Sequence, residues 1–265
     1  MRVLTTMKYF KKIGPILIAI VIVWVSGSLF VLFQTPSVLF QNQSSKTLKL
    51  NYGNFEQNWV NNSQGQRISL WYFAQANNKT ILYLHGNGGR SANIIASLNT
   101  QANVLSVAYL GYHESEGKPS VDGTYEAAEI AYNWLVNEKK IEEKNITILG
   151  HSMGGSPAVY LATRKTDAKQ LVIINTFSSV QSMCFNSFWI FCALNGDYFN
   201  SASLASGVTI PIRQFAYKND DSVPFEEGQK LYNYFNKSGD KQFIVMNKGT
   251  HNNPDFDQIF QNTQF

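Results

Sequence analysis

The feature that most constrains this 265-residue sequence is a serine framed by glycines between a predicted strand and a predicted helix. The apolar, β-branched run 146–149 predicts a buried strand, and the run 158–162 predicts the body of a helix. Between them stands Gly150-His-Ser-Met-Gly154. A serine on so sharp a turn takes an unfavourable backbone conformation, and the glycines remove Cβ atoms that would clash. The pattern therefore predicts a nucleophile elbow that presents Ser152 at a sheet edge, beside a helix N-terminus.

An ordinary serine in a glycine-rich loop is the alternative, and the surrounding sequence argues against it. Strands and helices alternate through the chain, which predicts parallel pairing and right-handed crossovers. The predicted fold class is α/β, with a mostly parallel central sheet flanked by helices and a site at the carboxyl ends of the strands. The other predicted strands are 67–73, 80–84, 103–108, 171–174, 210–216 and 241–246, and the other helices are 121–138 and 226–235.

A second glycine-rich stretch, His85-Gly-Asn-Gly-Gly89, follows the predicted strand 80–84. A loop with few side chains at this end of a sheet brings backbone N–H groups close to a ligand oxygen. A phosphate-binding loop is the alternative, but the P-loop lysine and the G-x-G-x-x-G fingerprint are both missing. The backbone N–H groups of Asn87 and Met153 are the predicted oxyanion hole.

Five segments occur in an order that resembles a known family. Together they are similar to the BEM46-type, ABHD12/13/17-like branch of the α/β-hydrolases, over residues 65 to 255. The sequence departs from that pattern at Ala108 and Leu110, where the family has Asp and Arg, and at Lys218-Asn219 and Thr250. The segments are Tyr83-Leu-His-Gly-Asn-Gly-Gly89, Gly111-Tyr-His-Glu-Ser-Glu-Gly-Lys-Pro-Ser120, Gly150-His-Ser-Met-Gly-Gly155, Asp220-Asp-Ser-Val-Pro224 and Gly249-Thr-His251.

The order Ser152, Asp220, His251 is that of the α/β-hydrolase triad, and each residue follows a predicted strand. In this interpretation Ser152 is the nucleophile, His251 the general base and Asp220 the carboxylate that orients the imidazole. The resemblance selects Asp220 over its neighbour Asp221, because the family's acid stands four residues before the proline. Turn formation or helix capping ahead of Pro224 is the alternative role for either carboxylate. Of the other histidines, His85 is expected to anchor its loop by hydrogen bonds, His151 to be structural and His113 to be a solvated loop residue.

The N-terminal segment of the chain predicts a membrane anchor. Residues 13–33 carry no charge, and as a helix they would span about 31 Å. Arg2, Lys8, Lys11 and Lys12 precede this segment, which predicts a cytoplasmic N-terminus and an extracytoplasmic catalytic body. A cleaved signal peptide is the alternative, although the apolar run continues beyond the small residues 26–28. The expected divisions are a basic tail (1–12), an anchor (13–33), a linker with edge strands (34–62) and the hydrolase domain (63–265).

The segment 176–207 interrupts the alternation and is rich in aromatic residues. It predicts either the packed core of a helical insert or an apolar lid over a substrate pocket, with Phe188 and Trp189 as candidate substrate-binding residues. The only two cysteines, Cys184 and Cys192, both lie here. They pair if the body occupies an oxidising compartment, and two buried thiols are the alternative.

Composition excludes several function classes. Beyond the first twelve residues the chain has 18 basic and 18 acidic residues, so its net charge is zero. A body without excess positive charge argues against nucleic-acid binding. The histidine and cysteine spacing predicts no metal site and no cofactor. The predicted function is hydrolysis of carboxylic esters or thioesters, and the predicted substrate is a small-molecule or lipid acyl ester. The membrane is contacted through the N-terminal helix, and no protein partner is evident. A serine peptidase, an acyltransferase and a non-catalytic hydrolase-like binding protein are the alternatives.

Overall fold

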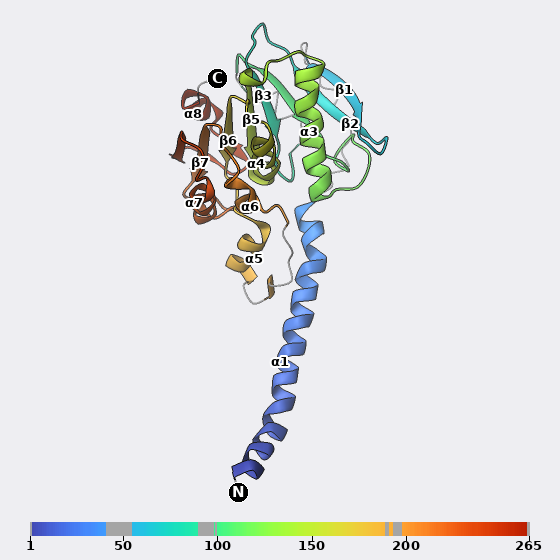
Figure 1. Cartoon of the computed structure of the whole chain (residues 1–265), viewed down its shortest axis with the longest axis vertical. Helices are drawn as coiled ribbons and strands as arrows, with labels where there is room; N and C mark the ends of the chain where they lie inside the picture. The colour runs from blue at the N-terminus through green and yellow to red at the C-terminus, as the bar shows by residue number, and fades with distance from the viewer. Residues whose placement is uncertain are drawn as a thin grey trace.

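An eight-stranded sheet forms the centre of the body (Figure 1). The computed structural model of the chain describes residues 2–40, 55–89, 98, 100–188, 191–192 and 198–263, with backbone only for 2–12 and 185–188. The strand order is β1-β2-β4-β3-β5-β6-β7-β8. The strands are β1 Phe55–Asn61, β2 Arg67–Phe73, β3 Thr80–Leu84, β4 Asn103–Val107, β5 Ile146–His151, β6 Gln170–Ile174, β7 Ile212–Tyr217 and β8 Lys241–Met246.

The predicted parallel sheet is confirmed for the six strands β3 to β8, while β1 and β2 pair antiparallel at one side of the sheet, next to β4. Because the six strands run parallel, the carboxyl ends of β3, β5, β7 and β8 all lie along the same end of the sheet. A small ribbon of β9 (Gly249–Thr250) and β10 (Asn253–Pro254) follows β8 at this edge. The loops that carry the candidate site residues therefore converge there.

Helices cover both faces of the sheet, so the central strands are buried on both sides. Leu82 and Leu84 of β3 belong to the core that includes the alanine-rich sides of α3 and α4. Ile81 and Tyr83 point to the opposite face, where Ile259 of α8 packs. The helices after the long N-terminal helix are α3 Val121–Asn137, α4 Gly155–Arg164, α5 Val180–Phe188, α6 Ser201–Ala205, α7 Phe225–Tyr234 and α8 Phe256–Gln261.

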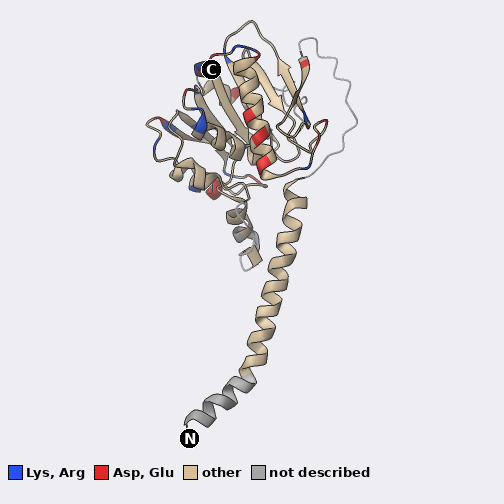
Figure 2. Ribbon diagram, turned by 45° about the vertical axis from the view of Figure 1, so that its right-hand side comes forward, with Lys and Arg blue, Asp and Glu red and all other residues tan. Residues whose placement is uncertain are grey.

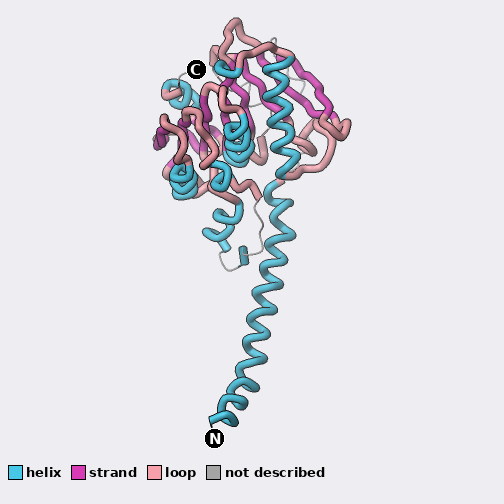
Figure 3. Tube along the Cα trace, in the orientation of Figure 1, coloured by secondary structure: helices cyan, strands magenta, loops and turns pink. Residues whose placement is uncertain are grey.

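Helix α1 (Arg2–Leu39) extends away from the body as one long rod (Figures 1 and 3). Its segment Ile13–Leu39 is a candidate membrane span with a mean hydropathy of 2.8. The helix continues past the expected anchor end at Phe33 to Leu39, where Leu39 packs against the core of the body. Figure 2 shows charged residues of both signs over the body and none on the described side chains of α1.

The insert between β6 and β7 contains α5 and α6, and α5 lies below the body beside α1 (Figures 1 and 3). A buried carboxylate fixes its base. Glu227 of α7 accepts hydrogen bonds from the Ser178 N–H at 3.1 Å, the Ser178 hydroxyl at 2.5 Å and the Ser182 hydroxyl at 2.5 Å. Hydrogen bonds to a charged acceptor are the stronger kind. The start of α5 is therefore held firmly against the body.

Candidate active site

Ser152 stands on the turn between β5 and α4, with a φ of 54° that side-chain-bearing residues rarely adopt. The turn is tight enough that a Cβ on Gly150 would lie 2.5 Å from the Gly154 carbonyl oxygen. A Cβ on Gly154 would lie 2.5 Å from the His85 carbonyl oxygen and would collide with that of Leu84. The predicted crowding of both glycines is present, and the neighbour that most restricts Gly154 is the end of β3. The elbow and the glycine-rich loop are thus pressed together.

The serine, histidine and carboxylate of the predicted triad lie in one hydrogen-bonded chain. The Ser152 Oγ is 2.9 Å from Nε2 of His251, and His251 Nδ1 is 2.8 Å from Oδ2 of Asp220. Asp220 follows β7, and His251 follows the first strand of the small β9–β10 ribbon. The neighbouring Asp221 instead accepts a hydrogen bond from the Ser222 hydroxyl at 3.0 Å. The arrangement supports proton transfer from the serine to a histidine whose second nitrogen is oriented by a carboxylate.

The Asp220 carboxylate is almost entirely covered, with a side chain only 1% exposed. Burial by itself raises the pKa of this group, but the hydrogen bonds from His251 and from the backbone N–H groups of Val223 and Ser222 outweigh it and hold the pKa below its usual value. The two N–H groups donate to Oδ1 at 2.7 and 2.8 Å, which leaves Oδ2 to the imidazole. Asp220 is therefore ionised at neutral pH and aimed at His251.

The remaining histidines hold the loops around the site. His151 donates from Nε2 to the His251 carbonyl at 2.8 Å, and burial lowers its pKa to about 4. Burial likewise lowers the pKa of His85 to about 4, and its Nδ1 donates to the Gly86 carbonyl at 2.7 Å. Both rings are therefore neutral. His113 was expected to be solvated, but it is half-buried, because its Nε2 donates to the Gly89 carbonyl at 2.8 Å.

The predicted oxyanion groups lie on either side of Ser152. Met153 follows the serine directly in the elbow, and the loop carrying Asn87 approaches so closely that a Cβ on Gly86 would be 3.1 Å from the Ser152 Cβ. The Asn87 side chain is engaged elsewhere, since its Nδ2 donates to the Val38 carbonyl at 2.8 Å. Only backbone N–H groups of this pair are thus suited to an oxyanion role.

The serine and histidine open into a cavity of about 990 Å³. The expected substrate-binding pair does not define it among the described residues, because the Phe188 side chain and all of Trp189 lie outside them. The apolar walls come instead from Phe177 and Met183 of the insert and from Val38 and Leu39 of α1. The described lining also includes Tyr83, Gly86, Asn87, Gly88, Gly89, His151, Met153, Ser222, Val223, Asn252, Asn253, Pro254 and Phe256.

Sequence reasoning missed the contribution of α1. Val38 and Leu39 lie 49 residues or more before Asn87 and Tyr112, so no local pattern connects them with the site. One signal was present, namely the apolar residues that resume after the polar positions Gln34, Thr35 and Ser37. Which part of the chain Val38 and Leu39 contact depends on tertiary packing alone.

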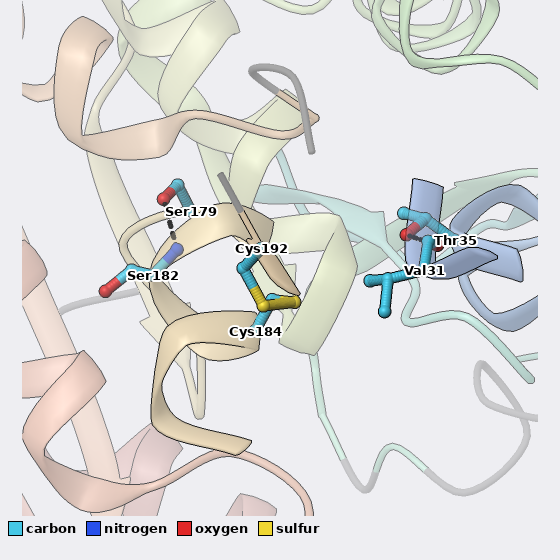
Figure 4. Close-up of a disulfide and its surroundings, with 6 residues drawn as sticks. All are labelled: Val31, Thr35, Ser179, Ser182, Cys184 and Cys192. Carbon is cyan, nitrogen blue, oxygen red and sulfur yellow. Dashed lines mark hydrogen bonds between the residues drawn. A yellow bond between two sulfur atoms is a disulfide. The ribbon is translucent and has the colours of Figure 1, made fainter. Parts of the chain in front are cut away.

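Cys184 and Cys192, whose state the sequence left open, form a disulfide across the tip of the insert (Figure 4). The figure also draws Val31 and Thr35 of α1 among its surroundings. A disulfide persists in oxidising compartments outside the cytosol. Among the described residues no group of histidine, cysteine and carboxylate side chains has the arrangement of a metal site.

The chain belongs to the α/β-hydrolase family. The family profile described as alpha/beta hydrolase fold matches residues 79–193. Uncharacterized protein R595 of Acanthamoeba polyphaga mimivirus is 31% identical over 204 residues, which cover 67% of this chain and 68% of that protein. Alpha/beta hydrolase domain-containing protein WAV2 of Arabidopsis thaliana is 30% identical over 138 residues, covering 49% of this chain and 45% of its own length.

Two further similarities add a lipase and a solved structure. Lysophosphatidylserine lipase ABHD12 of Danio rerio is 28% identical over 191 residues, which cover 61% of this chain and 49% of that protein. The crystal structure of alpha-beta hydrolase (ABH) from Vibrio vulnificus matches with a TM-score of 0.64 and 26% identity, covering 75% of this chain and 76% of that one. This chain thus spans about half the length of WAV2 and of ABHD12.

The close approach of the elbow to β3 predicts that Gly154→Ala strongly destabilises the protein. The added methyl group would collide with two backbone carbonyl oxygens that cannot move independently. We expect a loss of about 3 kcal/mol, or about 6–12 °C in Tm for a body of this size, measured by thermal unfolding of the full chain in detergent. Gly239→Ala is the matched control, because nothing lies within 4 Å of its Cβ position. Equal Tm values for the two variants would contradict this account of the elbow.

Proposed function

We propose that the protein is a membrane-anchored serine hydrolase that cleaves carboxylic esters or thioesters of acyl lipids. The observation that carries the proposal is the hydrogen-bonded chain Ser152–His251–Asp220, whose serine and histidine line a cavity that also has apolar side chains. Membership of the α/β-hydrolase family and the similarity to a lysophosphatidylserine lipase support the same reaction class.

The geometry suits a two-step acyl transfer. Ser152 Oγ attacks the acyl carbonyl while His251 Nε2 takes its proton, and the tetrahedral oxyanion is stabilised by the N–H groups of Met153 and Asn87. His251 then returns the proton to the leaving alcohol or thiol, which departs and leaves an acyl-enzyme. Water, activated by the same imidazole, hydrolyses this intermediate and regenerates the serine. Asp220 stabilises the imidazolium that forms in each step.

The alternatives differ in what the cavity must recognise. An aminopeptidase needs a carboxylate to bind the free amine of its substrate, and no acidic residue is found among the described lining residues. A non-catalytic binding protein has no need for a serine hydrogen-bonded to an oriented histidine. An acyltransferase would use the same acyl-enzyme and would differ only in the acceptor. Hydrolysis requires no acceptor other than water, and we therefore propose it as the function of this site.

Topology follows from the same features. The charge-free span Ile13–Leu39 and the basic residues before it favour an anchor with a cytoplasmic N-terminus. The Cys184–Cys192 disulfide independently favours a body on the oxidising side of the membrane. We therefore place the catalytic body in an extracytoplasmic compartment.

The nucleophile is tested by labelling. A fluorophosphonate probe should modify the wild-type protein and fail to modify Ser152→Ala, whose ester turnover should fall by about 10³-fold or more. Ser156→Ala, a serine of α4 in the same elbow region, is the control and should still be labelled. Equal labelling of wild type and Ser152→Ala would exclude the assignment.

The two adjacent carboxylates provide a matched pair for the acid. Asp220→Asn should lower turnover by about 10³- to 10⁴-fold, because the imidazole loses the acceptor that fixes its tautomer. Asp221→Asn should have a much smaller effect, since that side chain contacts Ser222 rather than His251. Steady-state kinetics on one soluble ester would decide, and the reverse ranking would show that Asp221 is the acid.

Topology can be read from the protein's only two cysteines. In membranes isolated under alkylating conditions, a maleimide polymer should shift the electrophoretic mobility of the protein only after reduction and unfolding, because both thiols are in the disulfide. Protease added outside sealed cells or spheroplasts should digest the body. Thiols that react without reductant, together with a protected body, would place the body in the cytoplasm.

A further inference from the structure

The end of the membrane helix is joined to the candidate active site by side-chain hydrogen bonds. The last carbonyls of a helix have no partner within it. In α1 two of these are capped by the body: the Val38 carbonyl accepts from Asn87 Nδ2 at 2.8 Å, and the Leu39 carbonyl accepts from the Tyr112 hydroxyl at 3.4 Å. The same Tyr112 hydroxyl lies 3.3 Å from Asn87 Oδ1, so its one hydrogen is shared between these two acceptors. The end of α1 and the loop that carries the proposed oxyanion donor are therefore joined by hydrogen bonds.

The side chains of this helix end face the same cavity as the nucleophile. Val38 and Leu39 line the cavity together with Ser152 and His251. Phe177 and Met183 of the insert also line it. The end of α1 and the insert thus both contribute apolar side chains to the cavity.

The insert also contacts α1 farther from the body, toward the N-terminus of the helix. A Cβ built on Gly27 would collide with the ring of Phe191, so this ring lies directly over the glycine. Gly27 is about 18 Å along the helix axis from Leu39. Ser28 is fully buried and Thr35 is 7% exposed, whereas most other side chains of the span are exposed. Small residues allow close packing of segments within a membrane, and the tip of the insert therefore contacts α1 within its apolar span.

The length of α1 sets the height of the site above the bilayer. The span Ile13–Leu39 has 27 residues and, as a helix, is about 40 Å long, whereas a bilayer core is about 30 Å thick. An anchor that begins to span near Ile13 therefore emerges from the core before Val38. Val38, Leu39 and the cavity they line then stand in the headgroup layer, where the ester bonds of membrane lipids lie.

From these contacts we propose that the acyl chain of a membrane lipid enters the cavity directly from the bilayer, between the end of α1 and the insert, and that Val38 and Leu39 are specificity-determining residues. This inference rests on the proposed ester hydrolysis. It assigns α1 a role beyond tethering, since the helix forms a wall of the acyl site and holds the insert in place. Short esters dissolved in water can reach Ser152 without passing along this route.

The test uses the full chain in phosphatidylcholine vesicles and two substrates, a palmitoyl lysophospholipid in the bilayer and a water-soluble butyrate ester. In Gly27→Leu the added side chain displaces Phe191, and in Val38→Trp the indole narrows the entrance. For both variants we expect the palmitoyl-to-butyryl ratio of kcat/KM to fall about tenfold. Gly14→Leu is the matched control, because nothing lies within 4 Å of its Cβ position on the same helix, and its ratio should equal that of the wild type.

The rate of fluorophosphonate labelling at Ser152 separates the possible failures. Variants that are labelled at the wild-type rate and keep the wild-type ratio would overturn the entry route while leaving ester hydrolysis intact. A ratio that also falls in Gly14→Leu would show a general effect of the anchor and would overturn it equally. A wild type that is not labelled and hydrolyses neither substrate would instead remove the proposed function, and the entry route with it.

Discussion

The close approach of the elbow to the end of β3 is the contact on which the site depends. The Gly154 Cα faces the carbonyls of Leu84 and His85, and a single added methyl group would not fit. This contact places the Ser152 turn against the loop Gly86–Gly89, and that proximity makes an oxyanion hole from two separate segments possible. A parallel sheet favours such a meeting, because neighbouring β3 and β5 end at the same edge.

A second layer of contacts turns this edge into a defined site. The His251 carbonyl is held by neutral, buried His151, while the His251 ring bridges Ser152 and Asp220. Asp220 is held in turn by two backbone N–H groups of its own turn. Each side chain of the chain Ser152–His251–Asp220 is therefore positioned by hydrogen bonds that do not depend on substrate, as preorganised catalysis requires.

Helix α1, the candidate membrane span, is connected to this site by direct contacts. Its last turn is capped by Asn87 and Tyr112, and the Phe191 ring of the insert packs over Gly27. The Cys184–Cys192 disulfide closes that tip, and Glu227 fixes the base of the insert. Helix α1, the insert and the loop Gly86–Gly89 thus form a connected set of elements around one cavity.

The sequence by itself determined the features that depend on local physics. Alternating apolar runs and helical segments predicted the parallel sheet, and the glycines around Ser152 predicted the strained turn, because only residues without a Cβ fit there. The uncharged run after the basic tail predicted a helix of membrane length. The order of Ser152, Asp220 and His251 matched the family, although spacing alone did not separate Asp220 from Asp221.

Tertiary structure alone decided which distant groups meet. Asp220 rather than Asp221 reaches His251 because the turn after β7 points Oδ2 inward and commits Oδ1 to backbone N–H groups. His113 is drawn onto the Gly89 carbonyl, and Cys184 is brought to Cys192 by the fold of the insert. The apolar residues that resume at Val38 were visible in the sequence, but their contact with the site was not, because only packing decides which segment an apolar helix end meets.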